Sequence, residues 1–349
     1  MHTLARLFVE PQLALELPPA EWNRILGQAR HARVVAKLEA AIRDEGVLPA
    51  IPQVAQEVLT GARVHVDYLQ QRLRFELTQL DFISRQLPAP FVLLKGAAYI
   101  AANSPAGAGR SVRDIDVLVH SEHLADTEAA LKDFGWHFKE DLTDYDEYYY
   151  RELSHELPPL RHPEHHYELD VHHSLIEPTH LWKPDIELML AQTVPLSGRH
   201  QLTLSTYDQF IHMATHLAAS DKPESGVRDL MDGYALLFAD KPTPDTISEL
   251  IERAKTVGLE APTIDTLHLL AGLLESTEAG HSLADVLQTV RVRGSGPLIR
   301  WASRKIIVEI DDSSGLMKSA AEWLVWGKVQ LFRMRPSQMF KHAWAKFKR

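Results

Sequence analysis

Two prolines, Pro88 and Pro90, end a long helical pattern and open a stretch in which short strands and helices alternate. Before them, the segment 54–86 places Leu, Val and Ala at helical spacing among charged and polar residues. After them, the continuous apolar run 91–94 predicts a strand that is covered on both faces. Beyond Pro184 the helical spacing returns. This order of patterns predicts a small sheet that lies between two helical regions.

The stretch that follows the two prolines is rich in expected strands. They fall at 91–94, 115–120, 136–138, 147–153 and 166–172, with helices over 97–102 and 122–134 between them. In the later part of the chain, the clearest helices are expected over 207–219, 227–238, 246–257 and 263–274. We therefore expect an α+β fold, in which a small mixed β-sheet is flanked by N-terminal and C-terminal helical regions.

The same patterns predict four parts of the chain. Residues 1–87 are expected to form an N-terminal helical region, 88–183 the α/β core and 184–292 a C-terminal helical domain. The remaining residues, 293–349, are expected to form a basic, aromatic-rich helical segment.

The charge of the chain limits what it can bind. The formal net charge is −10, so a long nucleic-acid duplex would be repelled unless a local basic patch overcame that field. Residues 328–349 form such a patch, with seven Lys or Arg, no Asp or Glu, and several aromatic side chains. A segment of this kind can contact a membrane surface or a protein partner. The favoured interpretation is a helix that packs on the domain through its aromatic side and is solvated on the other, and the surface-binding role stays open.

The lack of cysteine excludes disulfides, thiolate zinc sites and cysteine nucleophiles. The first 19 residues do not have the pattern of a signal peptide, because Arg6, Glu10 and Pro11 interrupt their apolar stretch. No run of about 18 apolar residues occurs anywhere in the sequence. From these observations we expect a cytoplasmic protein.

The sharpest chemical feature is R-S-V-R-D-I-D-V-L-V at residues 110–119. Side chains two apart on a strand project from the same face, with Cα atoms about 6.6 to 6.8 Å apart, so Asp114 and Asp116 are expected to point together. Neighbouring carboxylates repel each other, and a divalent cation removes that repulsion. Mg²⁺ takes oxygen ligands and shares them readily with phosphates. The pattern therefore favours a magnesium site over the alternative, an exposed strand edge whose acids face water.

Two further patterns accompany this pair. In L-L-K-G-A-A at 93–98, an apolar strand ends in glycine at the start of a helix, where backbone N–H groups can approach a phosphate. A tight turn that needs glycine only for its geometry explains this pattern equally well. In Y-E-L-D-V-H at 167–172, Asp170 and His172 share one face of a strand. Asp170 is the natural third carboxylate, able to hold the metal and to take a proton from an attacking hydroxyl.

In this order, K-G-A, R-x-x-D-I-D-V-L-V and L-D-V-H, the chain resembles the uncharacterised nucleotidyltransferase family within the polymerase-β-like nucleotidyltransferase superfamily. The resemblance covers roughly residues 80–240 and implies a nucleotidyltransferase core. It places Lys95 and Gly96 in the glycine motif, with His172 completing the last motif. Active members of the superfamily usually have Gly-Ser where this chain has Gly96-Ala97. Phosphate contact would therefore depend on the backbone, on Lys95, and on Arg110 or Arg113.

From this resemblance we expect Mg²⁺-dependent transfer of a nucleoside monophosphate from an NTP to an unknown acceptor, which is a small molecule, a protein or an RNA; Mn²⁺ would also serve. The expected catalytic and metal-binding residues are Asp114, Asp116 and Asp170. The expected nucleotide-binding residues are Lys95, Gly96, Ala97, Arg110, Arg113 and His172. Three alternatives stay open: a catalytically silent nucleotide-binding protein, a toxin-type transferase that modifies RNA or protein, and a scaffold without a metal.

Histidines form a weaker pattern. Seven of them lie between residues 155 and 180, without the H-E-x-x-H motif or a His-Asp dipeptide, which favours solvated histidines over a zinc site. His212 and His216 lie four apart on an expected helix, where they line a cleft or pack in the core. On the next helix, Arg228 and Asp232 have the spacing of an ion pair.

Overall fold

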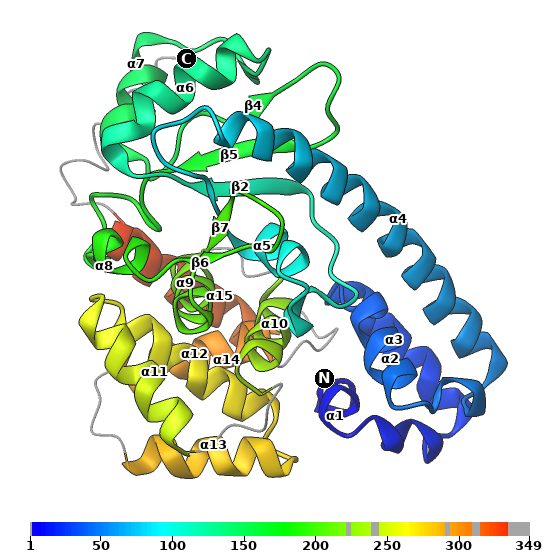
Figure 1. Ribbon diagram of the computed structural model, residues 1–349. Coiled ribbons are helices and arrows are strands. Elements are labelled where there is room, and N and C mark those ends of the chain that lie inside the picture. Colours follow the sequence, from blue (N-terminus) through cyan, green and yellow to red (C-terminus); the bar gives the residue numbers. More distant parts are fainter. Residues whose placement is uncertain (1, 221–224, 239–243, 290–293, 309–314, 334–349) are drawn as a thin grey trace.

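The computed structural model describes residues 2–220, 225–238, 244–289, 294–308 and 315–333. Within these residues, one seven-stranded mixed sheet lies between helical regions at both ends of the chain, so the predicted α+β class is confirmed. In Figure 1 the central strands β2 and β5 cross the upper part of the molecule, and the long helix α4 descends along one side. The helices α1 to α3 lie at the lower end of α4, and α11 to α13 lie on the opposite side.

The N-terminal helices are α1 His2–Val9, α2 Pro19–His31, α3 Val35–Asp44 and α4 Gln53–Ser84, with the 3₁₀ turns η1 Pro11–Leu15 and η2 Leu48–Ala50. The strands are β1 Val92–Leu93, β2 Asp114–Leu118, β3 His137–Phe138, β4 Leu160–Arg161, β5 Glu168–His172, β6 Val194–Pro195 and β7 Leu202–Thr203. Between them lie α5 Lys95–Ala101, η3 Pro105–Gly107, η4 Ser121–His123, α6 Leu124–Asp133, α7 Asp144–Tyr148, η5 Tyr149–Leu153 and α8 Ile186–Leu190. The later helices are α9 Thr206–Ala219, α10 Gly226–Phe238, α11 Pro244–Thr256, α12 Glu260–Leu273, α13 Glu278–Thr289, α14 Pro297–Ile307 and α15 Leu316–Arg333.

The strand order is β3-β4-β5-β2-β1-β7-β6. Strands β2 and β5 are parallel neighbours, whereas β1 pairs antiparallel with β2. Ile115 and Val117 are completely buried, which explains why this segment is a strand in the middle of the sheet. Because successive side chains alternate between the faces, Asp114 and Asp116 project from the opposite face of β2. The core of the sheet thus determines where its acids lie.

The strand expected at 147–153 was a wrong prediction. This segment is helical, with α7 followed by the π-turn η5. The Thr143 side chain accepts a hydrogen bond from the Asp146 backbone N–H, and the Asp146 carboxylate accepts one from the Thr143 backbone N–H. This capping box starts a helix, and it outweighs the β preference of the three consecutive tyrosines.

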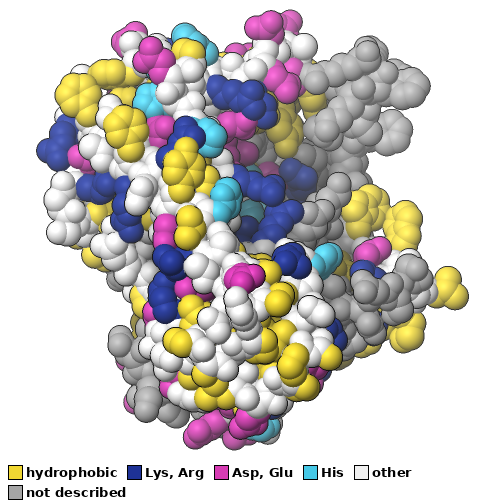
Figure 2. Space-filling view, turned by 90° about the vertical axis from the view of Figure 1, so that its right-hand side faces the viewer, with side chains coloured by type: hydrophobic (Ala, Val, Ile, Leu, Met, Phe, Trp, Pro, Cys, Tyr) yellow, Lys and Arg dark blue, Asp and Glu magenta, His cyan; other side chains and the backbone are white. Residues whose placement is uncertain are grey.

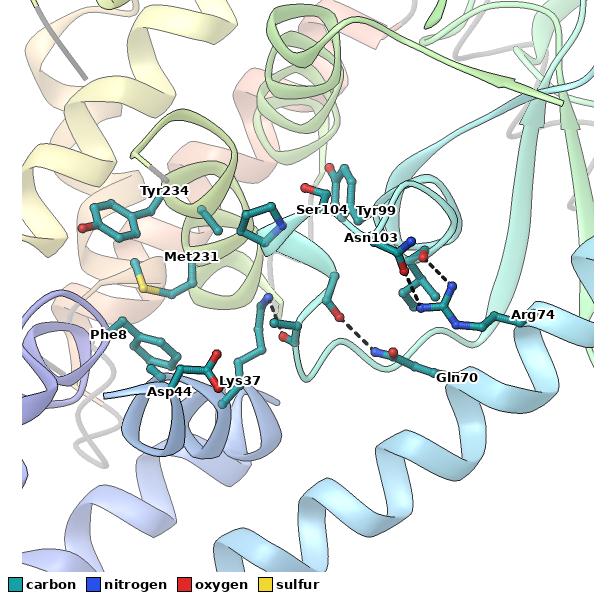
Figure 3. Close-up of a pocket in the computed structure, with 17 residues that line it drawn as sticks. Phe8, Lys37, Asp44, Gln70, Arg74, Tyr99, Asn103, Ser104, Met231 and Tyr234 are labelled. Carbon is teal, nitrogen blue, oxygen red and sulfur yellow. Dashed lines mark hydrogen bonds between the residues drawn. The ribbon is translucent and has the colours of Figure 1, made fainter. Parts of the chain in front are cut away.

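The N-terminal helices hold the loop that leads into β2. The ammonium of Lys37 on α3 donates to the carbonyls of Ala106 (2.7 Å) and Ala108 (3.2 Å). Gln70 on α4 donates to the carbonyl of Gly107, as the dashed line in Figure 3 shows. Gly109 has φ +61°, and a Cβ there would lie 2.3 Å from the carbonyl oxygen of Ala36. The loop can therefore approach α3 this closely only with glycine at that position.

The same lysine belongs to a buried charge cluster. Lys37 Nζ lies 2.9 Å from Asp232 Oδ1 on α10, and Arg110 Nε donates to Asp232 Oδ2 at 2.8 Å. Burial lowers the pKa of Lys37, and Asp232 partly offsets that effect. The expected ion pair between Arg228 and Asp232 was a wrong prediction, because Arg228 pairs with Asp229 instead. Asp232 therefore joins the N-terminal helices, the loop before β2 and the C-terminal helices.

Asp232→Asn is expected to lower the free energy of unfolding by about 3 to 5 kcal/mol, because it leaves two buried cations without their main counter-charge. Urea unfolding followed by circular dichroism measures the change. The matched control is Glu252→Gln, which removes an exposed carboxylate 4.0 Å from Lys255 and should give no measurable change. Equal stability of Asp232→Asn and the original chain would contradict a structural role for the cluster.

A cavity of about 510 Å³ lies beside this cluster, among α1, α3, α4, α5 and α10. Figure 3 shows Phe8, Met231 and Tyr234 on one side of it and Arg74 with Asn103 on the other. The guanidinium of Arg74 donates to the Ile100 carbonyl and to Asn103 Oδ1. The guanidinium of Arg74 is thus engaged in holding the C-terminal end of α5. None of the three expected catalytic aspartates lines the cavity.

No helix within the described ranges is both long enough and apolar enough to cross a membrane. Most of the basic segment 328–349 lies outside the described residues, which end at Arg333 on this side. Two of its basic residues are described. The side chain of Lys328 is 8% exposed and its Nζ lies 3.7 Å from Asp265 Oδ2, and Arg333 Nε lies 2.7 Å from Glu177 Oε1. Trp323, on the preceding part of α15, is exposed. The division of the chain at residues 87, 183 and 292 stays a prediction.

Candidate active site

The sheet register brings three aspartates to one place. In the parallel pair of β2 and β5, Asp114 lies opposite Glu168, and Asp116 lies directly opposite Asp170. Neighbouring strands are about 4.8 Å apart, and side chains at paired positions project from the same face. Asp116 is buried, with 4% of its surface exposed, whereas Asp114 at the start of the strand is exposed. The carboxylates of Asp116 and Asp170 are therefore immediate neighbours.

Asp116 is held by two nitrogen donors. Lys95 Nζ donates to Asp116 Oδ1 at 2.7 Å, and His172 Nε2 lies 3.0 Å from the same oxygen. Burial alone would raise the pKa of Asp116, but Lys95 and the hydrogen bond with His172 outweigh it and hold that pKa well below its usual range. For Lys95, burial favours the neutral amine, but Asp116 outweighs this effect and raises the pKa. Asp116 is thus a fixed negative charge.

Asp170 is in a different electrostatic state. Its Oδ1 is buried and has no hydrogen-bond partner among the described residues. Burial, followed by the charges of Asp116 and Glu156, raises the pKa of Asp170 to about 7. Burial and the charge of Asp116 also raise the pKa of Asp114. The site therefore concentrates more negative charge than its own cations neutralise, which is the state that a bound divalent cation relieves.

The turn before α5 brings the lysine into this site. Lys95 has φ +48°, a left-handed conformation that residues other than glycine rarely adopt. Such a conformation costs about 1 to 3 kcal/mol and is found most often at functional sites. Gly96 follows at the start of the helix, and Ala97 is buried with its methyl group in the core. The strained conformation is explained by the contact that it allows between Lys95 and Asp116.

Gly96→Ala is expected to destabilise the turn. A Cβ at Gly96 would lie 2.7 Å from Val112 Cγ2, closer than carbon atoms can approach without displacement. Overpacking of this kind typically costs about 1 to 3 kcal/mol, and thermal unfolding measures it. The double variant Gly96→Ala/Val112→Ala removes the contacting methyl and should recover part of the loss. A Gly96→Ala protein as stable as the original chain would show that the turn has room for a side chain.

The surface suits an anionic ligand despite the negative net charge. Figure 2 shows one face that is hollowed near its middle, where Lys and Arg side chains gather beside histidines. Two histidines of α9 also sense the charge of Lys95, which is the main cause that lowers the pKa of His216 to about 4, although this side chain is exposed. Burial, followed by Lys95, lowers the pKa of His212 well below its usual range. Both rings are thus neutral near pH 7 and add no charge to the site.

A comparison with protein families agrees with this arrangement. A family model described as "Uncharacterised nucleotidyltransferase" matches residues 18–275. The chain belongs to this family. The match extends well beyond the 80–240 range of the motif resemblance, and it includes most of the N-terminal helices that hold the loop before β2. Neither a comparison with curated proteins nor one with solved structures gives a significant match.

Within this family member, the two arginines expected to bind phosphate have different surroundings. Arg110 is buried, with its Nε on Asp232 and its Nη1 donating to the carbonyl of Ser111 at 2.7 Å. Arg113 is exposed directly before Asp114, without an ion pair among the described residues. Their phosphate contacts stay predictions, and the geometry favours Arg113 over Arg110 for that role.

The sequence patterns missed two groups of the candidate site. His155 and Glu156 lie against His172, with Glu156 Oε2 3.5 Å from His172 Nε2. The expectation of solvated histidines was therefore wrong for part of the cluster, because His172 and His180 are buried. The segment S-H-E-L at 154–157 gave only a weak signal, a polar pair directly before the apolar Leu157, and nothing in it indicates which strand His155 and Glu156 would contact.

Proposed function

We propose that this member of the nucleotidyltransferase family transfers a nucleoside monophosphate from an NTP to an acceptor hydroxyl or similar nucleophile. The observation that carries the proposal is the register of β2 and β5, which sets Asp170 and its unpartnered Oδ1 beside Asp116. In the reaction, the acceptor oxygen bonds to the α-phosphorus, and the bond from that phosphorus to the oxygen that bridges to the β-phosphate breaks. Pyrophosphate leaves with those electrons, and the acceptor proton passes to a base.

The donor set fits Mg²⁺, with Mn²⁺ as a second suitable ion. Asp114, Asp116 and Asp170 offer only carboxylate oxygens, which are the ligands that these cations prefer. The buried Oδ1 of Asp170, which has no protein partner among the described residues, is the kind of atom that a cation would satisfy. When bound, the ion would neutralise charge on the triphosphate and on the leaving pyrophosphate.

The chain's own residues would position the reactants. Lys95 Nζ, now on Asp116, would donate to a phosphate oxygen, and the backbone N–H groups of Gly96 and Ala97 at the start of α5 would donate to the phosphates as well. Asp170 would take the acceptor proton, because its Oδ1 has no hydrogen-bond partner among the described residues. His172 would orient Asp116 through the 3.0 Å contact. In this proposal catalysis is mainly positioning and electrostatics.

Binding of an NTP is expected to require Mg²⁺ or Mn²⁺. Calorimetry with each of the four NTPs, with Mg²⁺ and with EDTA, measures this dependence. The proposal predicts saturable binding of at least one NTP that disappears in EDTA, because Asp114, Asp116 and Asp170 would repel an uncompensated triphosphate. If no NTP bound in a Mg²⁺-dependent way, the transferase proposal would be abandoned.

Pyrophosphate release in an acceptor screen then separates a transferase from a catalytically silent nucleotide-binding protein. The screen contains small molecules, proteins and RNA, because nothing in the site selects among these acceptors. NTP binding without pyrophosphate release with any acceptor would favour the silent protein. That alternative is the main competitor, because Ala97 has a methyl group where active members usually have a serine hydroxyl. Contact of residues 328–349 with a membrane surface or a protein partner stays a separate proposal, supported by their composition.

A further inference from the structure

His155, Glu156 and His172 form a second cluster of metal-ligating side chains beside the three aspartates. Each offers one ligand atom, and these atoms all lie within 4.8 Å of one another. Glu156 Oε2 lies 3.7 Å from His155 Nε2 and 3.5 Å from His172 Nε2. The ring centroids of the two histidines are 5.3 Å apart. Two imidazole nitrogens and a carboxylate oxygen therefore face a common point.

The backbone holds this cluster in place. Residues 155–157 run antiparallel to the end of β5, where Glu156 and His172 form a bridge pair. The Leu157 N–H donates to the Val171 carbonyl at 2.8 Å, and the His173 N–H donates to the His155 carbonyl at 2.9 Å. Because the ligand-bearing residues lie on two hydrogen-bonded segments, only small rotations of their side chains would close the cluster around an ion.

The distances agree with a tetrahedral site. Zinc ligands at roughly 2.0 to 2.2 Å from the ion are separated from one another by roughly 3.3 to 3.5 Å. The two distances from Glu156 Oε2 are close to that separation. Imidazole nitrogen is a ligand for Zn²⁺ and other first-row transition metals, whereas Mg²⁺ prefers oxygen. The donor atoms thus distinguish this cluster from the aspartate site.

We propose that His155, Glu156 and His172 bind one transition-metal ion of the Zn²⁺ class, separate from the Mg²⁺ of the aspartate site. The ion would clamp the segment 155–157 onto β5, and its coordination by His172 Nε2 would replace the hydrogen bond that this nitrogen makes with Asp116. The site does not depend on the proposed transferase activity, because its ligands and its occupancy are defined without a nucleotide.

Zinc retention by the untagged, full-length protein tests the proposal. The protein is stripped with EDTA, dialysed against Zn²⁺ in a hundredfold excess of Mg²⁺, and analysed by elemental mass spectrometry. We expect one equivalent of Zn²⁺ in the original chain. His155→Ala and Glu156→Gln are each expected to weaken Zn²⁺ binding by at least about 100-fold, more than the loss of an indirect partner of a metal ligand would. Co²⁺ in place of Zn²⁺ should give the strong visible absorption of a tetrahedral site.

Two variants serve as controls. His166→Ala removes an exposed histidine from the same region, and Asp114→Asn alters the aspartate site alone; both should retain one equivalent of Zn²⁺. Failure to retain Zn²⁺ in the original chain, or full retention by folded His155→Ala and Glu156→Gln, overturns the proposal. Loss of Zn²⁺ in Asp114→Asn also overturns it, because the ion would then belong to the aspartates. If Zn²⁺ is retained but no NTP binds, the proposed function fails and the second metal site stands.

Discussion

Asp116→Asn is expected to lower kcat for pyrophosphate release by about 10³-fold or more. Asp116 is the fixed negative charge of the site, since Lys95 and His172 hold its pKa well below the usual range. The substitution removes a charged ligand from the proposed Mg²⁺ site, and several kcal/mol of transition-state stabilisation correspond to at least about three powers of ten in rate. The loss should appear at saturating NTP and Mg²⁺, measured as pyrophosphate released with the best acceptor from the screen.

The control for this variant separates chemistry from folding. Asn keeps the shape of Asp and an oxygen that can accept a hydrogen bond from Lys95, so the circular dichroism spectrum should not change. Asp133→Asn replaces an exposed aspartate on α6 and should retain full activity. Retention of pyrophosphate release in a folded Asp116→Asn protein would exclude the aspartate site as the catalytic centre.

Much of the fold could be predicted because the relevant signals are local. The apolar runs around Val92 and Val117 identify buried strands, and prolines mark where the helical regions end. The segment 147–153 shows the limit of such signals. Its tyrosines favour a strand, but the capping box of Thr143 and Asp146 decides for a helix, and both effects are local. A single-sequence pattern does not say which of two such preferences is the stronger.

The candidate site likewise has one part that local spacing predicts and another part that it does not. The D-x-D spacing places two carboxylates on one face of a strand, and a third acid on a later strand needs only the correct strand pairing to join them. The pairing of Arg110 with Asp232 joins residues 122 positions apart, and no local spacing encodes it. Glu156 reaches His172 only because residues 155–157 continue the sheet beyond β4 and β5. These contacts depend on tertiary structure, so the sequence patterns could not reveal them.

Asp170→Asn is expected to stabilise the metal-free protein at pH 8. Burial, with the charges of Asp116 and Glu156, raises the pKa of Asp170 to about 7, against about 3.9 in an unfolded chain. Below about pH 4 both states bind the proton, and the group does not affect stability. Between about pH 4 and 7 only the folded state keeps it, so stability falls as the pH rises, and above about pH 7 the full penalty applies. The difference of about three between the folded and unfolded pKa values sets an upper bound of about 4 kcal/mol on the loss of stability, and screening by solvent reduces this loss to about 2 kcal/mol.

Thermal unfolding of the metal-free proteins at pH 4 and pH 8 measures this difference. The Tm of Asp170→Asn should exceed that of the original chain at pH 8 and match it at pH 4, whereas Asp141→Asn, at an exposed position, should change neither value. Added Mg²⁺ should raise the Tm of the original chain at pH 8 more than that of the variant, because the ion neutralises the charge that the substitution removes. A variant less stable than the original chain at pH 8 without metal would show that Asp170 is a satisfied structural group. In that case its carboxylate would not be available as a metal ligand or as a base.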